Sequence, residues 1–460
     1  MTESTEKRTS SAPLKIYLDS VGCRLNQSEI DRFAHEISAA GHEVVHRPRQ
    51  ADIAIINTCA VTSSAEKQSR QISRRAARAG AKQVILTGCW ATLQPKQAAK
   101  LLHVTHVSSN QEKDSLIEIL LGSDGNTESD TLAPAGRVQG SNLRTRAFIK
   151  AQDGCNNRCT FCVTTLARGK SRSYSIEQLL KHVEAELEQG RKEVVLTGVQ
   201  LGAWGLDLHP QKHLGDLLQA ILDEKPVPRL RLSSLEPWNL KPEFFDLWRD
   251  RRLCAHLHLP LQSGSSAMLR RMNRRTTPDA YRKLIWQARE AIPDLAVTTD
   301  VLVGFPGESE REFQESLQFV RELRFSGGHV FSFSPRPGTR AAGFPDQIHP
   351  ALVKERNARM REVLAESGAS FRRRQVGSEV EVLWEGAAER VSGGWRLQGW
   401  SPNRMIVQAF SSTLRRNIID HVRLVSTMED GLWGEIIGET SFASPGQGQP
   451  PDSSINQPRI

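Results

Sequence analysis

The segment RAFIKAQDGCNNRCTFCVTTLARGKSRS (146–173) decides the fold of the central part of the chain. Its start, RAFIKAQ (146–152), is typical of a buried β-strand and leads into Cys155, Cys159 and Cys162, spaced C-x3-C-x2-C. Three thiolates on one short loop can bind three irons of a [4Fe–4S] cube and leave the fourth open to a small molecule. Zinc is the alternative, but zinc sites usually show paired C-x2-C units or a nearby His, which this loop lacks. The spacing favours an iron–sulfur cluster with one open position.

The same strand–loop–helix rhythm continues through residues 143–368. Runs rich in β-branched residues predict six strands, at 146–152, 193–199, 229–234, 255–260, 296–304 and 329–333. Six strands that are each followed by a helix suit a complete or partial (β/α) barrel, whose active site lies at the carboxyl ends of the strands. An open doubly wound sheet is the competing architecture.

A second set of three cysteines lies in residues 14–121. The apolar runs there predict buried parallel strands at 15–20, 51–57 and 82–88, with helices near 26–39 and 62–79. Cys23, Cys59 and Cys89 each follow one of these strands. Because the carboxyl ends of parallel strands meet at one edge of a sheet, we expect three soft thiolates to converge there and to suit a second cluster. A single cysteine is more often a small buried residue, which is how we interpret Cys254.

The remaining segments differ in composition from these two α/β regions. We predict a disordered leader at 1–13, a linker at 122–142 and a disordered tail at 439–460, because all three are polar and lack an apolar period. A basic helix near 353–374 precedes residues 369–438, where alternating apolar residues predict a small antiparallel β-barrel. The expected fold class is therefore α/β, with a β-barrel at the C-terminal end.

Composition restricts the function classes. Hydrophobic residues make up 38% of the chain, which is enough to build real cores. The formal net charge of +9 favours a polyanionic partner, although a merely basic enzyme is the alternative. We expect no membrane span and no secretion signal, because the chain contains no long apolar run and starts with a polar stretch. A cytoplasmic location follows, where the cysteines stay reduced.

These motifs together resemble the tRNA methylthiotransferase family over residues 14–438. GCNNRCTFCVTTLARGKSRS (154–173) is similar to the family's radical SAM segment. GCRLNQSE (22–29), NTCAVT (57–62) and TGCWATLQP (87–95) are similar to its three auxiliary-cluster segments. The β-rich C-terminal region resembles its TRAM domain in length, position and basic character.

The same segments indicate a branch of that family. Asn26-Gln27 and Val61-Thr62 resemble the branch that acts on N6-threonylcarbamoyladenosine beside the anticodon, whereas Arg24-Leu25, Trp90 and Thr164-Thr165 depart from the usual pattern. The alternative substrates are isopentenyladenosine of tRNA and an aspartate of a ribosomal protein. An alternative of another class is a non-catalytic RNA-binding iron–sulfur sensor.

The resemblance implies two [4Fe–4S] clusters and S-adenosylmethionine as cofactors. By it, Cys155, Cys159 and Cys162 bind the radical SAM cluster, and a sulfur-donating cluster is bound by Cys23, Cys59 and Cys89. It further implies insertion of a methylthio group at C2 of the adenine. The implied partners are a tRNA anticodon stem-loop, an external electron donor and a sulfur donor that the sequence does not identify.

Polar residues and glycines at the strand ends of the central section are candidates for S-adenosylmethionine contact. They are Gly198, Glu236, Gln262, Thr299 and Asp300. Structural capping of loops is the alternative role for each of them.

Basic and aromatic residues near the C-terminal end are candidates for RNA binding. The arginines are Arg372, Arg373, Arg374, Arg404, Arg415 and Arg416. Trp384, Trp395 and Trp400 are candidates for base stacking, with the barrel core as the alternative place for at least one of them.

Overall fold

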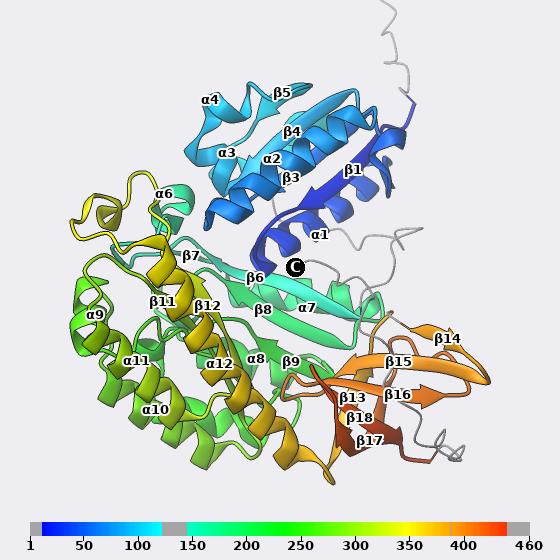
Figure 1. The fold of residues 1–460 in the computed structure, drawn as a ribbon. Helices are drawn as coiled ribbons and strands as arrows, with labels where there is room; N and C mark the ends of the chain where they lie inside the picture. Colours follow the sequence, from blue (N-terminus) through cyan, green and yellow to red (C-terminus); the bar gives the residue numbers. More distant parts are fainter. Residues whose placement is uncertain (1–11, 122–144, 387, 439–460) are drawn as a thin grey trace, which may run out of the picture.

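Three parts follow one another along the chain in the computed structural model, which describes residues 12–121, 145–386 and 388–438 (Figure 1). A parallel α/β domain comes first, a partial (β/α) barrel second and a small β-barrel last, which confirms the predicted fold class. The predicted linker and tail lie outside the described residues, as does almost all of the predicted leader.

The N-terminal domain contains a five-stranded sheet in the order β2-β1-β3-β4-β5, with every pair parallel. Its strands are β1 (Lys15–Ser20), β2 (Glu43–Val45), β3 (Ile53–Thr58), β4 (Gln83–Gly88) and β5 (Val104–Val107). Its helices are α1 (Arg24–Ala39), α2 (Ser63–Arg78), α3 (Cys89–Leu93), α4 (Pro95–Ala98) and α5 (Leu116–Leu121).

Helices cover both faces of this sheet, which is why its central strands are continuous apolar runs. Phe33 and Ile37 of α1 pack against Ile55 on one face, and Ala76 and Ala77 of α2 belong to the cluster on the other face. From β1 the chain adds β2 on one side and then β3, β4 and β5 on the other, so the strand order reverses between β1 and β3. The loops after these two strands therefore lie where open α/β sheets place their ligands.

The central part is a barrel of six parallel strands in sequential order. They are β6 (Arg146–Asp153), β8 (Glu193–Gly198), β9 (Arg229–Leu232), β10 (His256–His258), β11 (Ala296–Val303) and β12 (Gly327–Ser332). The short β7 (Arg172–Ser173) adds to β6 in the antiparallel direction. Bridges at Leu230–Leu253 and Ser234–His258 join the sheet that ends in β9 to the sheet that starts with β10. The sequential strand order lacks the reversal of an open doubly wound sheet, which excludes that alternative. Within the described ranges no pairing joins β12 to β6, so the barrel is partial.

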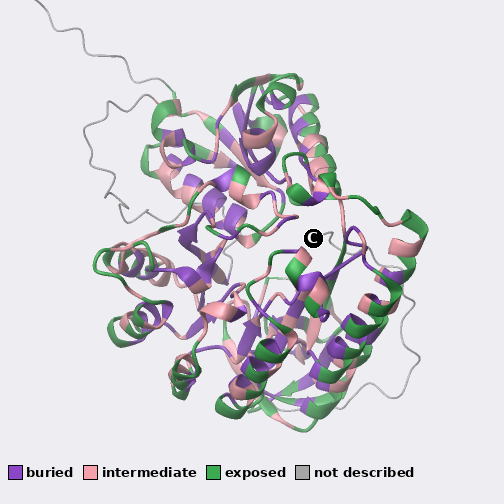
Figure 2. Ribbon diagram, turned by 90° about the vertical axis from the view of Figure 1, so that its left-hand side faces the viewer, coloured by how far each residue is buried: buried purple, intermediate pink, exposed green. Residues whose placement is uncertain are grey.

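Helices on the outside of the barrel enclose its apolar core. They are α7 (Ile176–Glu188), α8 (Leu214–Glu224), α10 (Pro278–Ala291) and α11 (Glu310–Leu323). Two shorter helices lie apart from this core: α6 (Thr164–Arg168) packs through Ala167 on the N-terminal domain, and α9 (Ser266–Arg271) contributes Met268 to a separate cluster. Buried residues gather in the strands and on the inner faces of these helices, while the outer faces are exposed (Figure 2). None of the helices that the structure describes has the length and apolarity needed to cross a bilayer.

The helix α12 (Pro350–Gln375) leads from the central barrel to the C-terminal β-barrel. The strands of that barrel are β13 (Glu379–Trp384), β14 (Glu389–Val391), β15 (Gly394–Trp400), β16 (Ile406–Ser411), β17 (Ile419–Thr427) and β18 (Leu432–Ile436). Pairing of β13 with β15 closes five strands, and β14 extends β15. The predicted small antiparallel β-barrel is confirmed, with one parallel pair: β18 lies between β17 and β16 and runs parallel to β16.

Candidate functional site

The loop after β6 holds Cys155, Cys159 and Cys162 close together. Main-chain bonds shape it, since the Cys155 amide donates to the Gly169 carbonyl oxygen (3.0 Å) and the Cys162 amide to that of Cys159 (3.2 Å). The Cys155 thiol also approaches Gln200 Oε1 at 3.2 Å. The half-buried thiols therefore share one small region at the carboxyl end of β6.

Polar groups around these sulfurs suit thiolates. Backbone amides of Asn157 and Thr164 each lie 3.4 Å from a cysteine sulfur, and Arg274 Nη1 lies 3.8 Å from Cys159 Sγ. Burial raises the pKa of Cys155 to about 12, and the neighbouring thiols add to that shift. A cationic iron centre would reverse this shift, because a bound metal deprotonates a coordinating thiol. The donor set thus fits an iron–sulfur cluster.

The second set converges at the edge of the N-terminal sheet because two glycines allow close backbone approach. Gly22 has φ +105°, and a Cβ there would lie 2.7 Å from Cys59 Sγ. Gly88 has φ +94°, and its Cβ would lie 2.3 Å from the Thr58 carbonyl oxygen. Both backbone conformations are ones that side-chain-bearing residues rarely adopt. Glycine is therefore required where the loops of Cys23, Cys59 and Cys89 meet.

Electrostatic interactions confirm that these three thiols are neighbours. Burial raises the pKa of Cys59 to about 12, and Cys89 and Cys23 raise it further. Arg168 opposes the shift at Cys59, as it does at Cys23, where loss of water contact is the larger effect. Asn110 Nδ2 lies 3.7 Å from Cys89 Sγ. Three thiols that share a nearby guanidinium match the donor set of a second cluster.

The spacing of both sets differs from that of a single-ion site. Nowhere in the described ranges do three His, Cys, Asp or Glu side chains come close enough to share one metal ion. Thiolates around one zinc would be about 4 Å apart, given Zn–S bonds of about 2.3 Å. Thiolates on a cube bind separate irons, so they stand further apart.

A buried ionic network joins the two cysteine regions. Arg168 ends α6, the helix that follows the Cys162 loop, and Arg168 Nη1 donates to Asp153 Oδ1 (2.9 Å) and Glu29 Oε1 (3.0 Å). Arg168 Nη2 donates to Asn26 Oδ1 (2.7 Å), three residues after Cys23. Figure 1 shows α1, which carries Asn26 and Glu29, lying beside β6. One guanidinium therefore fixes the Cys23 loop relative to the Cys162 loop.

The network is charge-balanced in a way that keeps Glu29 ionised. Glu29 is completely buried, and Lys113 Nζ lies 2.8 Å from its Oε2. Burial by itself would raise the pKa of Glu29, but Arg168, Lys113 and Lys150 outweigh it and hold that pKa well below its ordinary value. The interface between the domains thus depends on a carboxylate surrounded by three cations.

Comparisons with known proteins match both regions. Residues 149–320 match the Radical SAM superfamily, and residues 15–108 match the Uncharacterized protein family UPF0004. The chain is 33% identical to the threonylcarbamoyladenosine tRNA methylthiotransferase MtaB of Chlamydia pneumoniae, over 91% of this chain and 97% of that protein. It is 36% identical to the MtaB of Thermotoga maritima, over 80% and 86%.

The chain belongs to the radical SAM tRNA methylthiotransferase family. It is also 30% identical to a tRNA-2-methylthio-N(6)-dimethylallyladenosine synthase of Thermoanaerobacter sp., over 92% of this chain and 93% of that protein. Among solved structures, the radical S-adenosylmethionine methyltransferase TsrM of Kitasatospora setae covers 72% of this chain and 77% of its own, with a TM-score of 0.55 and 15% identity. That likeness shows the fold. Because it belongs to the radical SAM superfamily, this methylthiotransferase uses a [4Fe–4S] cluster and S-adenosylmethionine.

Two of the predicted cofactor contacts carry unsatisfied polar atoms. Glu236 Oε2 and Asp300 Oδ1 are buried without a hydrogen-bond partner among the described residues. Burial raises the pKa of Glu236 to about 7. Arg274, which approaches Cys159, also stacks on Trp238 at 4.5 Å. Buried polar atoms without partners are rare, so this part of the methylthiotransferase fits a polar ligand such as S-adenosylmethionine.

The other three residues predicted to contact S-adenosylmethionine make contacts within the protein. The Thr299 hydroxyl is fully buried and donates to the Leu259 carbonyl oxygen (2.8 Å), so its surroundings favour a structural role over cofactor contact. Gln262 has φ +72° and exchanges main-chain bonds with β11. Gly198 packs closely on Gln152, since a Cβ added at Gly198 would lie 3.0 Å from Gln152 Oε1. Cofactor contact by Gly198 and Gln262 remains a prediction.

The arginines predicted to bind RNA have unequal surroundings. Arg373 and Arg374 are exposed at the end of α12, whereas Arg372 donates to the Glu429 carbonyl oxygen (3.0 Å). Arg415 pairs with Asp420 at 2.9 Å. Arg416 is half-buried beside Gly386, and Arg404 is half-buried beside Trp400. RNA contact by each of these arginines remains a prediction.

One of the three tryptophans of the C-terminal barrel lies in its core, and the other two are partly exposed. Trp384 is completely buried in the C-terminal barrel core and donates its indole N–H to Asp420 Oδ2 (2.7 Å). Trp395 and Trp400 are half-buried. The core alternative is confirmed for Trp384, and the other two retain surface for stacking.

The sequence analysis missed residues that are distant in sequence but contact the cysteines or their loops in the folded structure. Gln200 and Arg274 come from segments far from the cluster loop, and no local pattern marks them. The one signal was the ARGKSRS segment, whose Arg168 follows Cys162 too closely to lie far from the cluster loop. Cys254 is buried behind β9 and belongs to neither set, in agreement with a packing role.

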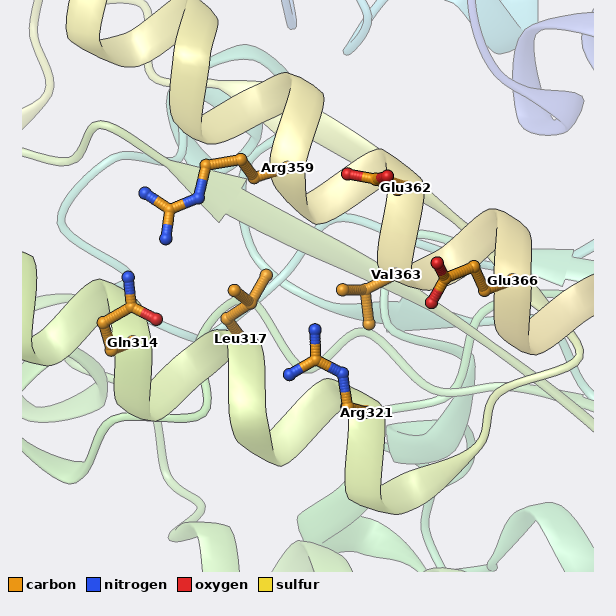
Figure 3. Close-up of a pocket in the computed structure, with 7 residues that line it drawn as sticks. All are labelled: Gln314, Leu317, Arg321, Arg359, Glu362, Val363 and Glu366. Atoms are coloured by element: carbon orange, nitrogen blue, oxygen red, sulfur yellow. The ribbon is translucent and has the colours of Figure 1, made fainter.

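A separate groove of about 400 Å³ lies between α11 and α12 on the outside of the barrel. Arg321, Arg359 and Glu362 line it (Figure 3). None of the cysteines or other predicted site residues is among the lining residues, so the groove is separate from the candidate site.

Proposed function

We propose that this methylthiotransferase attaches a methylthio group to C2 of N6-threonylcarbamoyladenosine beside the anticodon of tRNA, with two [4Fe–4S] clusters. Relatives named for that activity match most of the chain at 33–36% identity. Relatives named for the dimethylallyladenosine product match at 30–31%.

The observation that carries the proposal is the pair of three-thiol sets tied together by Arg168. A reaction that joins a sulfur group to an unactivated aromatic carbon needs a radical source and a sulfur source close to each other. When bound, the clusters and S-adenosylmethionine supply the radical and sulfur chemistry, while the protein supplies binding, orientation and electrostatics. Two separate cysteine sets at adjoining strand ends are what such a division requires.

The protein's own residues would position and shield this chemistry. Gln200 and Arg274 hold the Cys155 and Cys159 side of the loop. Glu236 and Asp300 offer unpaired oxygens to a cationic or hydroxyl-bearing ligand, which suits the amino group and ribose of S-adenosylmethionine. Arg168 fixes the Cys23 loop over the same region. Each of these groups orients a ligand or a loop, and none acts as a general acid or base.

The partners follow from the same proposal. The excess of basic residues suits an RNA anticodon stem-loop, because phosphate neutralisation releases counterions. The reaction also needs an external electron donor and a sulfur donor. A cytoplasmic location belongs to this proposal, since reduced thiols are required on both loops.

Nucleoside mass spectrometry tests the function directly. Reconstituted protein is incubated anaerobically with reductant, S-adenosylmethionine and tRNA that carries either threonylcarbamoyladenosine or isopentenyladenosine. We expect the methylthio product from the first tRNA only. Product from the second alone would reassign the branch, and no product despite S-adenosylmethionine cleavage would direct the search to a ribosomal protein aspartate.

An iron and sulfide count separates the enzyme from a non-catalytic sensor. We expect about eight irons per chain after reconstitution, since each cube contains four. A protein with about four irons and no cleavage of S-adenosylmethionine would instead behave as a sensor.

A further inference from the structure

The last strand of the central barrel, β12, has two faces of different character. Val330 belongs to the apolar core shared with α12, and Asn357 of α12 donates to the Ser332 hydroxyl (3.2 Å). Because side chains alternate along a strand, His329 and Phe331 point to the opposite face, which is the inside of the barrel. No pairing joins β12 to β6 within the described ranges, so this inner face borders the open side of the barrel.

The inner face of β12 is aromatic and uncovered. Phe331 is 39% exposed, and among the exposed large apolar residues of the described ranges it is the only one on a strand of the central barrel. His329 is exposed as well, and its ring centroid lies 6.2 Å from that of Phe331, with the planes tilted by 50°. Single exposed apolar residues are ordinary on outer surfaces, but side chains inside a small barrel normally fill its interior. Two uncovered rings at this position suit a flat ligand.

Phe331 lies close to the cysteine loop that follows β6. Its partner in register on β11 is Leu302. Leu302 is buried in a small apolar cluster with Phe305, and Phe161 packs against that cluster. Phe161 lies between the second and third cysteines of the loop, and its ring centroid is 6.4 Å from that of Phe305. One layer of apolar side chains therefore separates Phe331 from the radical SAM cysteines.

The segment after β12 is tied to a loop of the N-terminal cysteine set. The hydroxyls of Ser334 and Ser63 lie 3.1 Å apart, and Arg336 Nη1 donates to the Ala60 carbonyl oxygen (3.3 Å). Ala60 directly follows the second cysteine of that set. Arg336 is buried, so its contact lies inside the interface between the domains. The carboxyl end of β12, which carries Phe331, thus lies between the two cysteine sets.

The base that receives sulfur has to reach the same place. Under the proposed function the methylthio group joins a carbon of adenine, so the adenine ring must come within reach of both cysteine sets. A base in an RNA becomes accessible to an enzyme when it is turned out of its stack, and aromatic side chains can then hold it by its flat face. The uncovered rings of β12 match this requirement in position and in chemistry.

S-adenosylmethionine is the other ligand with an adenine ring, but its predicted polar contacts lie on the other side of the barrel. Glu236 follows β9, three strands away from β12, and Arg274 follows α9. Asp300 of β11 pairs with His258 (3.3 Å) of β10, the neighbouring strand on the side away from β12. The rings of β12 are therefore left for the adenine of the tRNA.

We propose that Phe331 and His329 form a stacking platform that holds the target adenine of the tRNA between the two cysteine sets. The inference rests on the proposed function and deepens it, because it names the residues that contact the base to be modified. The platform contacts the ring that threonylcarbamoyladenosine and isopentenyladenosine share, so it captures the base and does not choose between the two. Phe331 is a substrate-binding residue and holds neither cluster.

A binding cycle between protein variants and RNA variants tests the platform. The RNAs are two synthetic anticodon stem-loops, one with threonylcarbamoyladenosine beside the anticodon and one with an abasic residue there. The proteins are the reconstituted full-length chain and its variants Phe331→Leu, which lacks the ring, and Phe331→Tyr, which keeps it. Trp286→Leu is the matched control, because it removes a ring that is 57% exposed on α10, on the outside of the barrel.

We expect the unchanged protein to bind the base-carrying RNA about tenfold more tightly than the abasic RNA, as for one base stacked on an aromatic side chain. Phe331→Leu should bind both RNAs with nearly equal affinity, because the ring and the base contribute through their mutual contact. Phe331→Tyr and Trp286→Leu should keep the preference for the base. The affinity for S-adenosylmethionine should be the same in all four proteins, which also shows that the variants are folded.

Three results would overturn the platform. Equal weakening of both RNAs by Phe331→Leu would assign the ring to the fold or to another part of the RNA. Full preference for the base in Phe331→Leu would remove the ring from base recognition. Loss of S-adenosylmethionine affinity with an intact preference for the base would assign the ring to the adenine of the cofactor. Failure of the proposed function is distinct, because the unchanged protein would then make no methylthio product while its preference for the base persists.

Discussion

Cys155, Cys159 and Cys162 lie on one loop, whereas Cys23, Cys59 and Cys89 come from the ends of three separate strands. The first set is brought together by its spacing on one loop, which local main-chain bonds shape and which bonds from Thr160 to Arg271 and Met272 tie to the end of α9. The second set depends on correct folding of the whole N-terminal sheet and on close approach at Gly22 and Gly88. Two sites of similar chemistry can therefore differ in how much of the fold each requires.

The largest effect is expected from Cys159→Ala. Loss of one thiolate from the radical SAM loop should abolish S-adenosylmethionine cleavage and the methylthio product together. Binding of the anticodon stem-loop should persist, because the arginines that we expect to contact RNA lie on other elements. Deoxyadenosine release and RNA affinity measure the two outcomes, and lost RNA binding would contradict the separation of roles.

Cys59→Ala should disable the auxiliary cluster site and leave the radical SAM site intact. Cleavage of S-adenosylmethionine should continue while the methylthio product disappears. The iron content should fall from about eight to about four per chain. Full product formation by this variant would remove the auxiliary-cluster proposal.

Arg168→Met should remove the hydrogen bonds that hold the Cys23 loop against the Cys162 loop. The change leaves Glu29 and Asp153 buried with fewer partners, which typically costs about 3–5 kcal/mol for a broken buried ion pair. We expect a lower free energy of unfolding in denaturant titration, and less methylthio product for each S-adenosylmethionine cleaved. Arg168→Lys should restore part of that ratio, since it keeps the charge.

The matched control for this variant is Arg172→Met. Arg172 pairs with Asp114 but is largely exposed, and exposed pairs contribute about 0–1 kcal/mol. Its unfolding free energy and product ratio should stay close to those of the unchanged protein. Equal losses in Arg168→Met and Arg172→Met would show that Arg168 has no special position.

The smallest effect is expected from Gly22→Ala. A left-handed alanine costs about 1–2 kcal/mol, and its Cβ would press on Cys59 Sγ. The auxiliary site should lose a fraction of its iron while the radical SAM site keeps all of it, as measured by iron content and S-adenosylmethionine cleavage. Gly41→Ala, which has φ +80° and no atom within 4 Å of its Cβ, controls for backbone strain alone.

The sequence predicts most of the fold because its strands have strong, simple patterns. The runs that become β3 and β4 are buried on both faces, and β1 has an apolar centre at Ile16, Tyr17 and Leu18, so the position of each strand and of the cysteine after it is predictable. The edge strand β5 escaped prediction because VTHV has little apolar character. The parallel pairing of β18 with β16 also escaped, because alternation along a strand does not fix the direction of its neighbour.

The candidate site was predictable only where its residues form local motifs. The spacing of Cys155, Cys159 and Cys162 is visible in the chain, but the partners Gln200 and Arg274 reach the loop from other strands and helices. The pairing of Arg168 with Glu29 joins residues far apart in sequence, so only the folded structure reveals it. Thr299 shows the opposite case: it was predicted at a strand end, but it lies in the middle of β11, where its hydroxyl holds the neighbouring Leu259 segment.

Exchange of domains between relatives depends on the Glu29–Arg168 contact. An N-terminal domain grafted from another member onto this barrel brings its own residue to the place of Glu29. Where that residue is acidic, the graft meets Arg168, Lys150 and the barrel face with matching charge. Where it is neutral, Arg168 and Lys150 lose one of the two carboxylates that they share and keep only Asp153. The charge at this one position should therefore weigh heavily in the compatibility of the two halves of such chimeras.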